Sequence, residues 1–200
     1  MATTHRYTIR PFDPAAHLFE VRVTVDTPDP EGQVFEMPAW IPGSYMIRDY
    51  ARHVIAARAE SDGRDVALRK LDKSRWQAHA VDRELTLVLE IYAYDDSVRG
   101  AHLDLTHAFF NGTCVFPAVC GQEDVPCSVD IQAPEKPVGR KWRVATSMRR
   151  DSAEEYGFGT YQVADYAELV DHPVEIGELS IGEFEARGVP HAIAIRGNTR

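Results

Sequence analysis

The sequence has no apolar run of the length that a membrane-spanning helix requires, and it does not open with a basic segment followed by an apolar one. Basic residues are in the minority, with 22 lysines and arginines against 31 aspartates and glutamates, so the formal net charge is −9. A nucleic acid or an anionic membrane would need a positively charged stripe. We therefore predict no nucleic-acid partner, no membrane partner and a cytoplasmic location.

Cysteine is also scarce. The three cysteines are Cys114, Cys120 and Cys127, and no two of them form a Cys-x-x-Cys pair. An odd number cannot be fully paired in disulfides, so this usage is typical of buried thiols in a reducing compartment.

Familiar catalytic motifs are missing too. None of the eight histidines is followed by Glu or by a second His four residues on, so the His-Glu-x-x-His arrangement of zinc peptidases is absent. Ser44 follows Gly43 without the second glycine of a nucleophile elbow. Cys114 and His107 could form a nucleophilic pair, but a lone cysteine in a strand is more typical of a core. We predict that the chain contains no catalytic residue and no metal ligand.

The nearest approach to a ligand cluster is the segment 101–107, Ala-His-Leu-Asp-Leu-Thr-His. If it is one extended strand, His102 and Asp104 share a face and His107 lies on the opposite one. We therefore interpret the three side chains as polar groups of a loop, and a metal site is the less favoured alternative.

Short alternating segments indicate a β-rich fold. In residues 18–25, Phe19, Val21, Val23 and Val25 share one face, and in residues 84–93 Leu85, Leu87, Leu89 and Ile91 do so. A helical turn is predicted only at 164–171, with Asp165 as N-cap. We expect one mostly β domain over residues 1–200, an antiparallel β-sandwich. The strands are expected at 5–10, 18–25, 33–37, 53–60, 68, 74–80, 84–93, 113–119, 125–133, 141–147, 175–185 and 189–196, with hairpin turns at 61–63 and 111–112.

The most constrained stretch is residues 37–54, which reads as a built loop. Pro38 and Pro42 each fix φ, and Gly43 after Pro42 predicts a type II turn. Such a turn can deliver the ring and guanidinium groups around it to a substrate or to another domain. Alternatively, the stretch is a large connecting loop in which Trp40 and Tyr45 cover one end of the hydrophobic core.

Residues 38–52 read Pro-Ala-Trp-Ile-Pro-Gly-Ser-Tyr-Met-Ile-Arg-Asp-Tyr-Ala-Arg, and this run resembles the hallmark of the N-terminal domain of the M61 peptidases, the glycyl aminopeptidase family. Two later runs are similar to the end of the same domain, in the same order. They are 142–147, Trp-Arg-Val-Ala-Thr-Ser, and 164–177, Ala-Asp-Tyr-Ala-Glu-Leu-Val-Asp-His-Pro-Val-Glu-Ile-Gly. The resemblance covers most of the chain.

This resemblance implies a β-rich module ahead of a zinc-dependent, thermolysin-like catalytic domain, usually with a PDZ domain beyond it. The chain would then be an N-terminal module cut from a longer protein. Zinc would belong to the full-length protein, and no cofactor would bind to these residues. The implied partners are the catalytic domain of the same polypeptide and a peptide substrate. Our candidates for the substrate cleft or the domain interface are Trp40, Ser44, Tyr45, Arg48 and Asn111.

Two functions of different class remain open. In the first, the chain is the non-catalytic N-terminal domain of an M61-like metalloaminopeptidase, which packs on the zinc domain and helps to wall its cleft. In the second, it is a free-standing β-sandwich that binds a peptide or a sugar, with Trp40, Tyr45 and Tyr50 as a stacking platform. A domain that packs on a neighbour should display exposed apolar surface, whereas an independent module should not.

Because the zinc-binding motif is missing, we expect the 200-residue chain to bind no stoichiometric zinc and to release no product from a glycyl anilide. Metal analysis of the purified protein and a chromogenic assay test this expectation. Stoichiometric zinc together with hydrolysis would contradict it.

Overall fold

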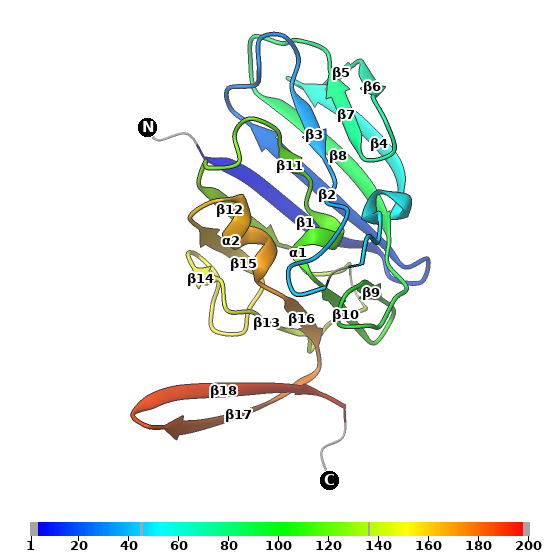
Figure 1. Cartoon of the computed structure of the whole chain (residues 1–200). Helices are drawn as coiled ribbons and strands as arrows, with labels where there is room; N and C mark the ends of the chain where they lie inside the picture. Colours follow the sequence, from blue (N-terminus) through cyan, green and yellow to red (C-terminus); the bar gives the residue numbers. More distant parts are fainter. Residues whose placement is uncertain (1–3, 45, 136, 198–200) are drawn as a thin grey trace.

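The computed structural model describes residues 4–44, 46–135 and 137–197, and β-strand is its predominant secondary structure (Figure 1). The strands are β1 His5–Asp13, β2 Leu18–Val25, β3 Val34–Glu36, β4 Val54–Ser61, β5 Arg64–Val66, β6 Leu68–Lys70, β7 Arg75–Ala78, β8 Leu85–Tyr92, β9 Ala101–Leu103, β10 His107–Phe110, β11 Ala118–Val119, β12 Cys127–Ile131, β13 Arg143–Ala145, β14 Arg149–Arg150, β15 Gly159–Val163, β16 Val174–Gly177, β17 Leu179–Ala186 and β18 Val189–Arg196. The helices are the 3-10 turn η1 Tyr50–His53, α1 Gly112–Val115 and α2 Tyr166–Asp171. With four and six residues, neither described α-helix could cross a bilayer.

An eight-stranded sheet in the order β14-β15-β12-β1-β2-β8-β4-β5 forms the first layer. Alternate residues of its central strands point to one apolar face, as the pattern predicts. Along β8, Leu85, Leu87, Leu89 and Ile91 are buried, and the matching residues of β2 are Phe19, Val21, Val23 and Val25. The other face is charged and partly exposed, with ion pairs such as Arg22 to Glu60 at 2.9 Å. Most pairings are antiparallel, but β1 and β12 run parallel, from His5 opposite Cys127 to Ile9 opposite Ile131.

The second layer covers the apolar face. It contains the sheet β11-β3-β7-β6 and the two short helices, and the sheet β13-β16-β10-β9 lies at one end (Figure 1). Tyr7 of β1 shows how the layers join, because its ring packs edge-to-face on Phe116 at 5.4 Å and its hydroxyl donates to the Pro117 carbonyl at 3.0 Å. Burial of this hydroxyl raises the pKa of Tyr7 well above its usual value. The expected mostly β, sandwich-like architecture is confirmed.

Two hairpin turns follow from their sequences. Asp62 and Gly63 join β4 to β5 with φ of 50° and 71°, and Arg187 and Gly188 join β17 to β18 with φ of 52° and 78°. Two consecutive left-handed residues match the right-handed twist of the paired strands.

The predicted helix near residues 164–171 is also confirmed, as α2. Asp165 is its N-cap and accepts a hydrogen bond from the Glu168 N–H at 2.8 Å, while the Glu168 carboxylate accepts one from the Ala164 N–H. The helix ends at Asp171, two residues before Pro173. These reciprocal bonds satisfy N–H groups that a helix start otherwise leaves unpaired.

The prediction of a strand over 113–119 and a hairpin turn at 111–112 was wrong. Residues 112–115 form α1, and only Ala118–Val119 is extended. All four residues of α1 are buried, so burial does not alternate along this segment. The sequence pattern therefore cannot distinguish a helix from a strand here. Gly112 permits this packing because a Cβ atom at this position would lie 2.7 Å from the Leu169 carbonyl oxygen of α2.

The three thiols are free and form no disulfide, with Cys114 and Cys127 buried and Cys120 partly buried. Burial raises their pKa values to about 12 for Cys114 and Cys127 and about 11 for Cys120. The three thiols are therefore protonated at neutral pH, and none is a ready nucleophile.

The contact between α1 and α2 predicts the effect of a single methyl group. Gly112→Ala should lower the free energy of unfolding by roughly 1–3 kcal/mol, because the new Cβ meets backbone atoms that cannot move aside. Gly182→Ala in β17 is the control, since a Cβ atom there has no neighbour within 4 Å. Urea unfolding of both variants measures the difference, and equal stabilities would contradict the packing argument.

Candidate functional site

The proline-rich segment contains the predicted type II turn. Pro42 and Gly43 are its central residues, Gly43 has a φ of 81°, and the Ser44 N–H donates to the Ile41 carbonyl at 3.0 Å. Only glycine adopts this φ readily at the third position of such a turn.

Further contacts fold the segment back on itself. The N–H groups of Arg48 and Asp49 both donate to the Ala39 carbonyl, at 2.7 and 3.1 Å. The Asp49 carboxylate also lies 2.8 Å from the Lys73 ammonium, and Asp49 itself is left-handed, with a φ of 49°. These contacts therefore anchor the described part of the loop 38–49 near both of its ends.

Three buried donors hold a second segment, residues 94–100. Tyr50 belongs to the first segment, whereas Asn111 and Cys114 lie at the N-cap and inside α1. The Tyr50 hydroxyl donates to the Arg99 carbonyl at 2.9 Å, and the Cys114 thiol donates to the same oxygen at 3.5 Å. The Asn111 side-chain amide donates to the Val98 carbonyl at 2.6 Å. We call residues 38–44, 46–53 and 94–100 together the rim.

The donors that tie the rim are kept protonated by their surroundings. Burial is the main cause that raises the pKa of Tyr50, and it also raises that of Cys114. Neither group can therefore act as a base or a nucleophile near neutral pH, and both serve to hold backbone.

The structure places the candidate residues in different roles. Trp40 is 51% exposed, whereas Ser44 is buried and accepts a hydrogen bond from the Arg48 guanidinium at 3.4 Å. Asn111 is also buried, immediately before α1, with its amide committed to the rim. Tyr45 lies outside the described residues. Trp40, Ser44 and Arg48 thus share one loop, and Asn111 holds the other segment of the rim through the Val98 carbonyl.

Sequence reasoning missed the apolar side chains that the rim exposes. Met46 and Ile47 are each 64% exposed, Val98 is 73% exposed and Tyr94 is 59% exposed. In the sequence, Val98 stands alone between polar residues, so no periodicity marks the segment 94–100. Its fixed backbone and exposed valine appear only in the fold.

Tyr50 departs from the stacking platform considered above. Its ring is only 3% exposed and its hydroxyl is bonded to the Arg99 carbonyl, so it cannot stack on a ligand. Of the three proposed platform residues, Trp40 is exposed, Tyr50 is buried and Tyr45 is not described.

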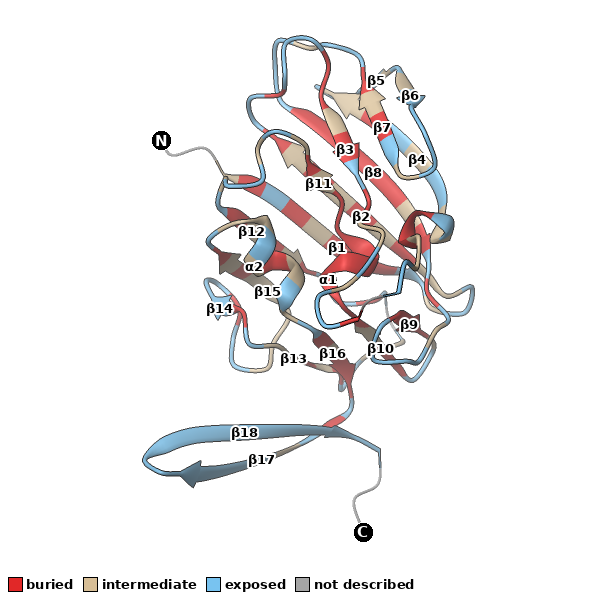
Figure 2. Ribbon diagram, in the orientation of Figure 1, coloured by how far each residue is buried: buried red, intermediate tan, exposed pale blue. Residues whose placement is uncertain are grey.

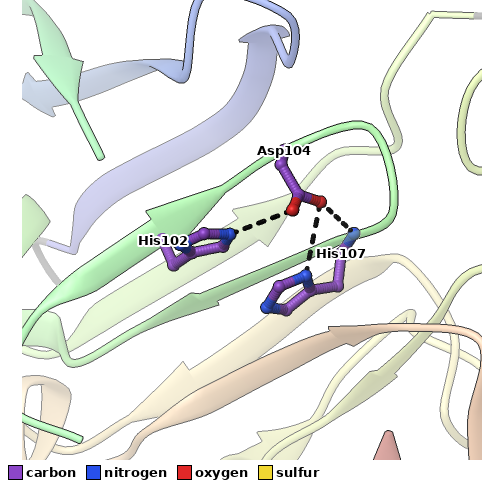
Figure 3. Close-up of side chains that lie close together, drawn as sticks. All are labelled: His102, Asp104 and His107. Atoms are coloured by element: carbon purple, nitrogen blue, oxygen red, sulfur yellow. Dashed lines mark hydrogen bonds and ion pairs between the residues drawn. The ribbon is translucent and has the colours of Figure 1, made fainter. Parts of the chain in front are cut away.

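His102, Asp104 and His107 come together, contrary to the expectation that His107 lies on the opposite face (Figure 3). That expectation assumed one extended strand. The chain instead reverses between β9 and β10, with Phe109 opposite His102, so His102 and His107 are on the same side of a hairpin. Asp104 closes the turn, and its Oδ1 accepts from the Thr106 N–H, the Thr106 hydroxyl and the His107 N–H at 2.6–2.9 Å.

Hydrogen bonds favour the charged form of the carboxylate in this cluster. Burial acts to raise the pKa of Asp104. The hydrogen bonds from Thr106, His102 and His107 outweigh this effect and hold the pKa of Asp104 well below its usual value. Burial lowers the pKa of His107. A neutral imidazole beside an ionised, fully bonded carboxylate is the arrangement of a structural turn.

Among the residues that the structure describes, this trio is the group whose spacing could hold a metal ion, since its ligand atoms lie within 4.8 Å of one another. The ring orientations do not fit zinc. A metal binds an imidazole nitrogen in the plane of the ring, but the His102 and His107 rings are stacked, with centroids 4.4 Å apart and planes inclined by 22°. Their lone pairs run side by side and do not converge on one tetrahedral centre.

The sequence profile of the peptidase M61 N-terminal domain matches residues 6–178. The chain belongs to this family. No curated protein matches the sequence.

Solved structures agree with this assignment of an M61 N-terminal domain. An aminopeptidase N family protein from Idiomarina loihiensis superposes with a TM-score of 0.94 at 39% identity, over 98% of this chain and 33% of that one. The M1 zinc metallopeptidase from Deinococcus radiodurans has a TM-score of 0.51 at 11% identity, over 92% of this chain and 44% of that one, and this likeness shows the fold alone. The M61 N-terminal domain described here spans about a third of the length of the Idiomarina protein.

The tie through Asn111 yields a prediction about the rim. Asn111→Ala should cost roughly 1–3 kcal/mol of stability, because it leaves the Val98 carbonyl without its donor, and it should speed amide hydrogen exchange in residues 94–100. Asn111→Asp keeps the shape but removes the donor, so it should loosen the same segment. Gln132→Ala, at an exposed amide, is the control. Unchanged exchange in both Asn111 variants would show that the tie does not hold the rim.

Proposed function

We propose that residues 1–200 form one non-catalytic N-terminal domain of an M61-like metalloaminopeptidase. In this role the domain packs on the zinc catalytic domain of the same polypeptide and helps to wall the peptide-substrate cleft. The observation that carries the proposal is the rim, a hydrogen-bonded loop pair that exposes apolar side chains at fixed positions.

Exposed apolar groups on a rigid backbone favour contact with another surface. Met46, Ile47 and Val98 are more than 60% exposed. The Arg48 N–H, directly after Ile47, donates to the Ala39 carbonyl, and the Val98 carbonyl accepts from the Asn111 amide. Burying such side chains gains roughly 25 cal/mol per Å² of apolar area, and little ordering entropy is lost because the loops are already fixed.

A wall suits the chemistry of an aminopeptidase. An enzyme that removes residues from one end of a chain must exclude folded protein and must fix the distance from the substrate N-terminus to the metal. Zinc, when bound in the catalytic domain, would polarise the scissile carbonyl and activate water. The residues of this chain would bind and orient the peptide and exclude solvent.

Within the rim we assign contact roles to the candidates of the first loop. Trp40 would supply an apolar surface to a substrate side chain or to the catalytic domain, and Arg48 would supply a cationic head held in place by Ser44. Tyr45 is retained as a candidate of the same loop. Asn111 would act as a positioning residue, because its amide fixes the second loop.

The free-standing binding module is the weaker candidate. It relied on three neighbouring aromatic rings, and the burial of Tyr50 removes one of them. The exposed rim residues are mainly aliphatic, which suits a protein surface better than a sugar ring.

The proposal predicts the reading frame and the effect of one ring. The natural frame should continue past Arg200 into a segment with His-Glu-x-x-His. In that longer protein Trp40→Ala should lower kcat/KM for an aminoacyl substrate about five- to fiftyfold, because a cleft contact is lost. Phe12→Ala is the matched control, since Phe12 is similarly exposed but lies on β1. A frame that ends at Arg200, or equal activity of the Trp40 and Phe12 variants, would contradict the proposal.

A further inference from the structure

The last two strands stand apart from the sandwich. After Gly177 the chain leaves the body of the domain, and β17 and β18 form a two-stranded hairpin that pairs with no other strand of the described chain (Figures 1 and 2). Isolated hairpins of two strands are marginal in water and need packing on at least one face.

The pairing register assigns each residue to a face. Directly opposite residues of an antiparallel pair share a face, and Phe184 is opposite His191 while Ala186 is opposite Val189. The apolar face therefore carries no Asp, Glu, Lys or Arg. It consists of Ser180, Gly182, Phe184, Ala186, Val189, His191, Ile193 and Ile195.

The charged face is the other one, and its root is already occupied. It consists of Leu179, Ile181, Glu183, Glu185, Pro190, Ala192, Ala194 and Arg196. Leu179 is buried and Ile181 is partly buried, and the Arg196 guanidinium lies 4.0 Å from the Glu175 carboxylate of β16. The charged face thus meets the body of the domain at its root.

No described residue covers the apolar face along its length. All eight of its residues are exposed, including Phe184 at 48%, Val189 at 54%, Ile193 at 48% and Ile195 at 43%. The Phe184 and His191 rings are stacked with centroids 5.0 Å apart, so the face presents a flat apolar surface. A contiguous surface of this kind marks a protein contact.

Two comparisons indicate what covers it. The family profile ends at residue 178, directly before β17. The superposition with the Idiomarina loihiensis protein nevertheless covers 98% of this chain, so most of the hairpin is common to both proteins, and two-thirds of that protein lies outside the superposed part. The hairpin is therefore present in a protein whose chain is about three times as long, although it is not part of the profile of the N-terminal domain.

We propose that the apolar face of the β17–β18 hairpin is the docking surface for the catalytic domain that follows in the same polypeptide, which covers it with an uncharged apolar surface of its own. The inference rests on the proposed function, because it names the same catalytic domain as partner. Tethering favours this partner over a second copy, since a segment joined directly after β18 is held at high effective concentration beside the hairpin.

Cysteine labelling of the two faces tests the inference. Ile193→Cys places a thiol on the apolar face, and Ala192→Cys places one on the charged face one residue away. Labelling rates are compared in the 200-residue chain and in the full-length protein. In the short chain both thiols should label rapidly. In the full-length protein Ile193→Cys should label at least a hundredfold more slowly, while Ala192→Cys should change less than tenfold.

Each other outcome is decisive. Equal labelling of Ile193→Cys in the two proteins would overturn the docking inference, and the effect of Trp40→Ala would still report on the proposed function. If only Ala192→Cys were protected, the contact would lie on the charged face, and this result would also overturn the inference. Slow labelling of Ile193→Cys in the short chain that becomes faster on dilution would make a second copy the occupant, and it would also overturn the inference.

Discussion

The structure depends on covering one apolar face. The central strands β2 and β8 present leucine, isoleucine, valine and phenylalanine side chains to one side, and β1 adds Tyr7 and Ile9. Burial of that surface is the dominant favourable term in folding, and the second layer excludes water from it. The cover is made of short strands, turns and two small helices, and the rim residues belong to this covering layer. The same constraint that closes the core therefore fixes the loops that we propose for the cleft.

Much of the first layer could be predicted from sequence, because alternate residues of its central strands are apolar. In β2 the alternation of burial matches the alternation of residue type. In β8 the alternate residues Leu85, Leu87, Leu89 and Ile91 are buried as expected, although Thr86 and Val88 between them are buried too. The α2 helix and the turns at Gly43, Gly63 and Gly188 were equally readable, since each depends on local chemistry. These signals need no knowledge of the rest of the chain.

The errors fall where burial or a turn removes the local signal. Thr113, Cys114 and Val115 are buried on every side, so no periodicity distinguishes helix from strand, and only the close approach of Leu169 to Gly112 decides it. The reversal at residues 104–106 contains neither glycine nor proline, and it is closed by Asp104 through hydrogen bonds to residues that follow. For the candidate site, the proline turn was predicted, but the exposure of Val98 and the support from Asn111 depend on contacts between segments far apart in sequence.

The parallel pair of β1 and β12 has a consequence for the order of folding. β1 lies between β2, its neighbour in sequence, and β12, whose partner residues are Cys127 to Ile131. β1 pairs with a segment that is more than half the chain away in sequence, and such a pairing raises the contact order. The entropy cost of closing this long loop must be overcome before the pairing forms. During synthesis, the β1–β2 hairpin can form early with one edge open. The sheet closes only after β12 and β15 have left the ribosome, and until then the edge of β1 is the part of the nascent chain most exposed to wrong pairing.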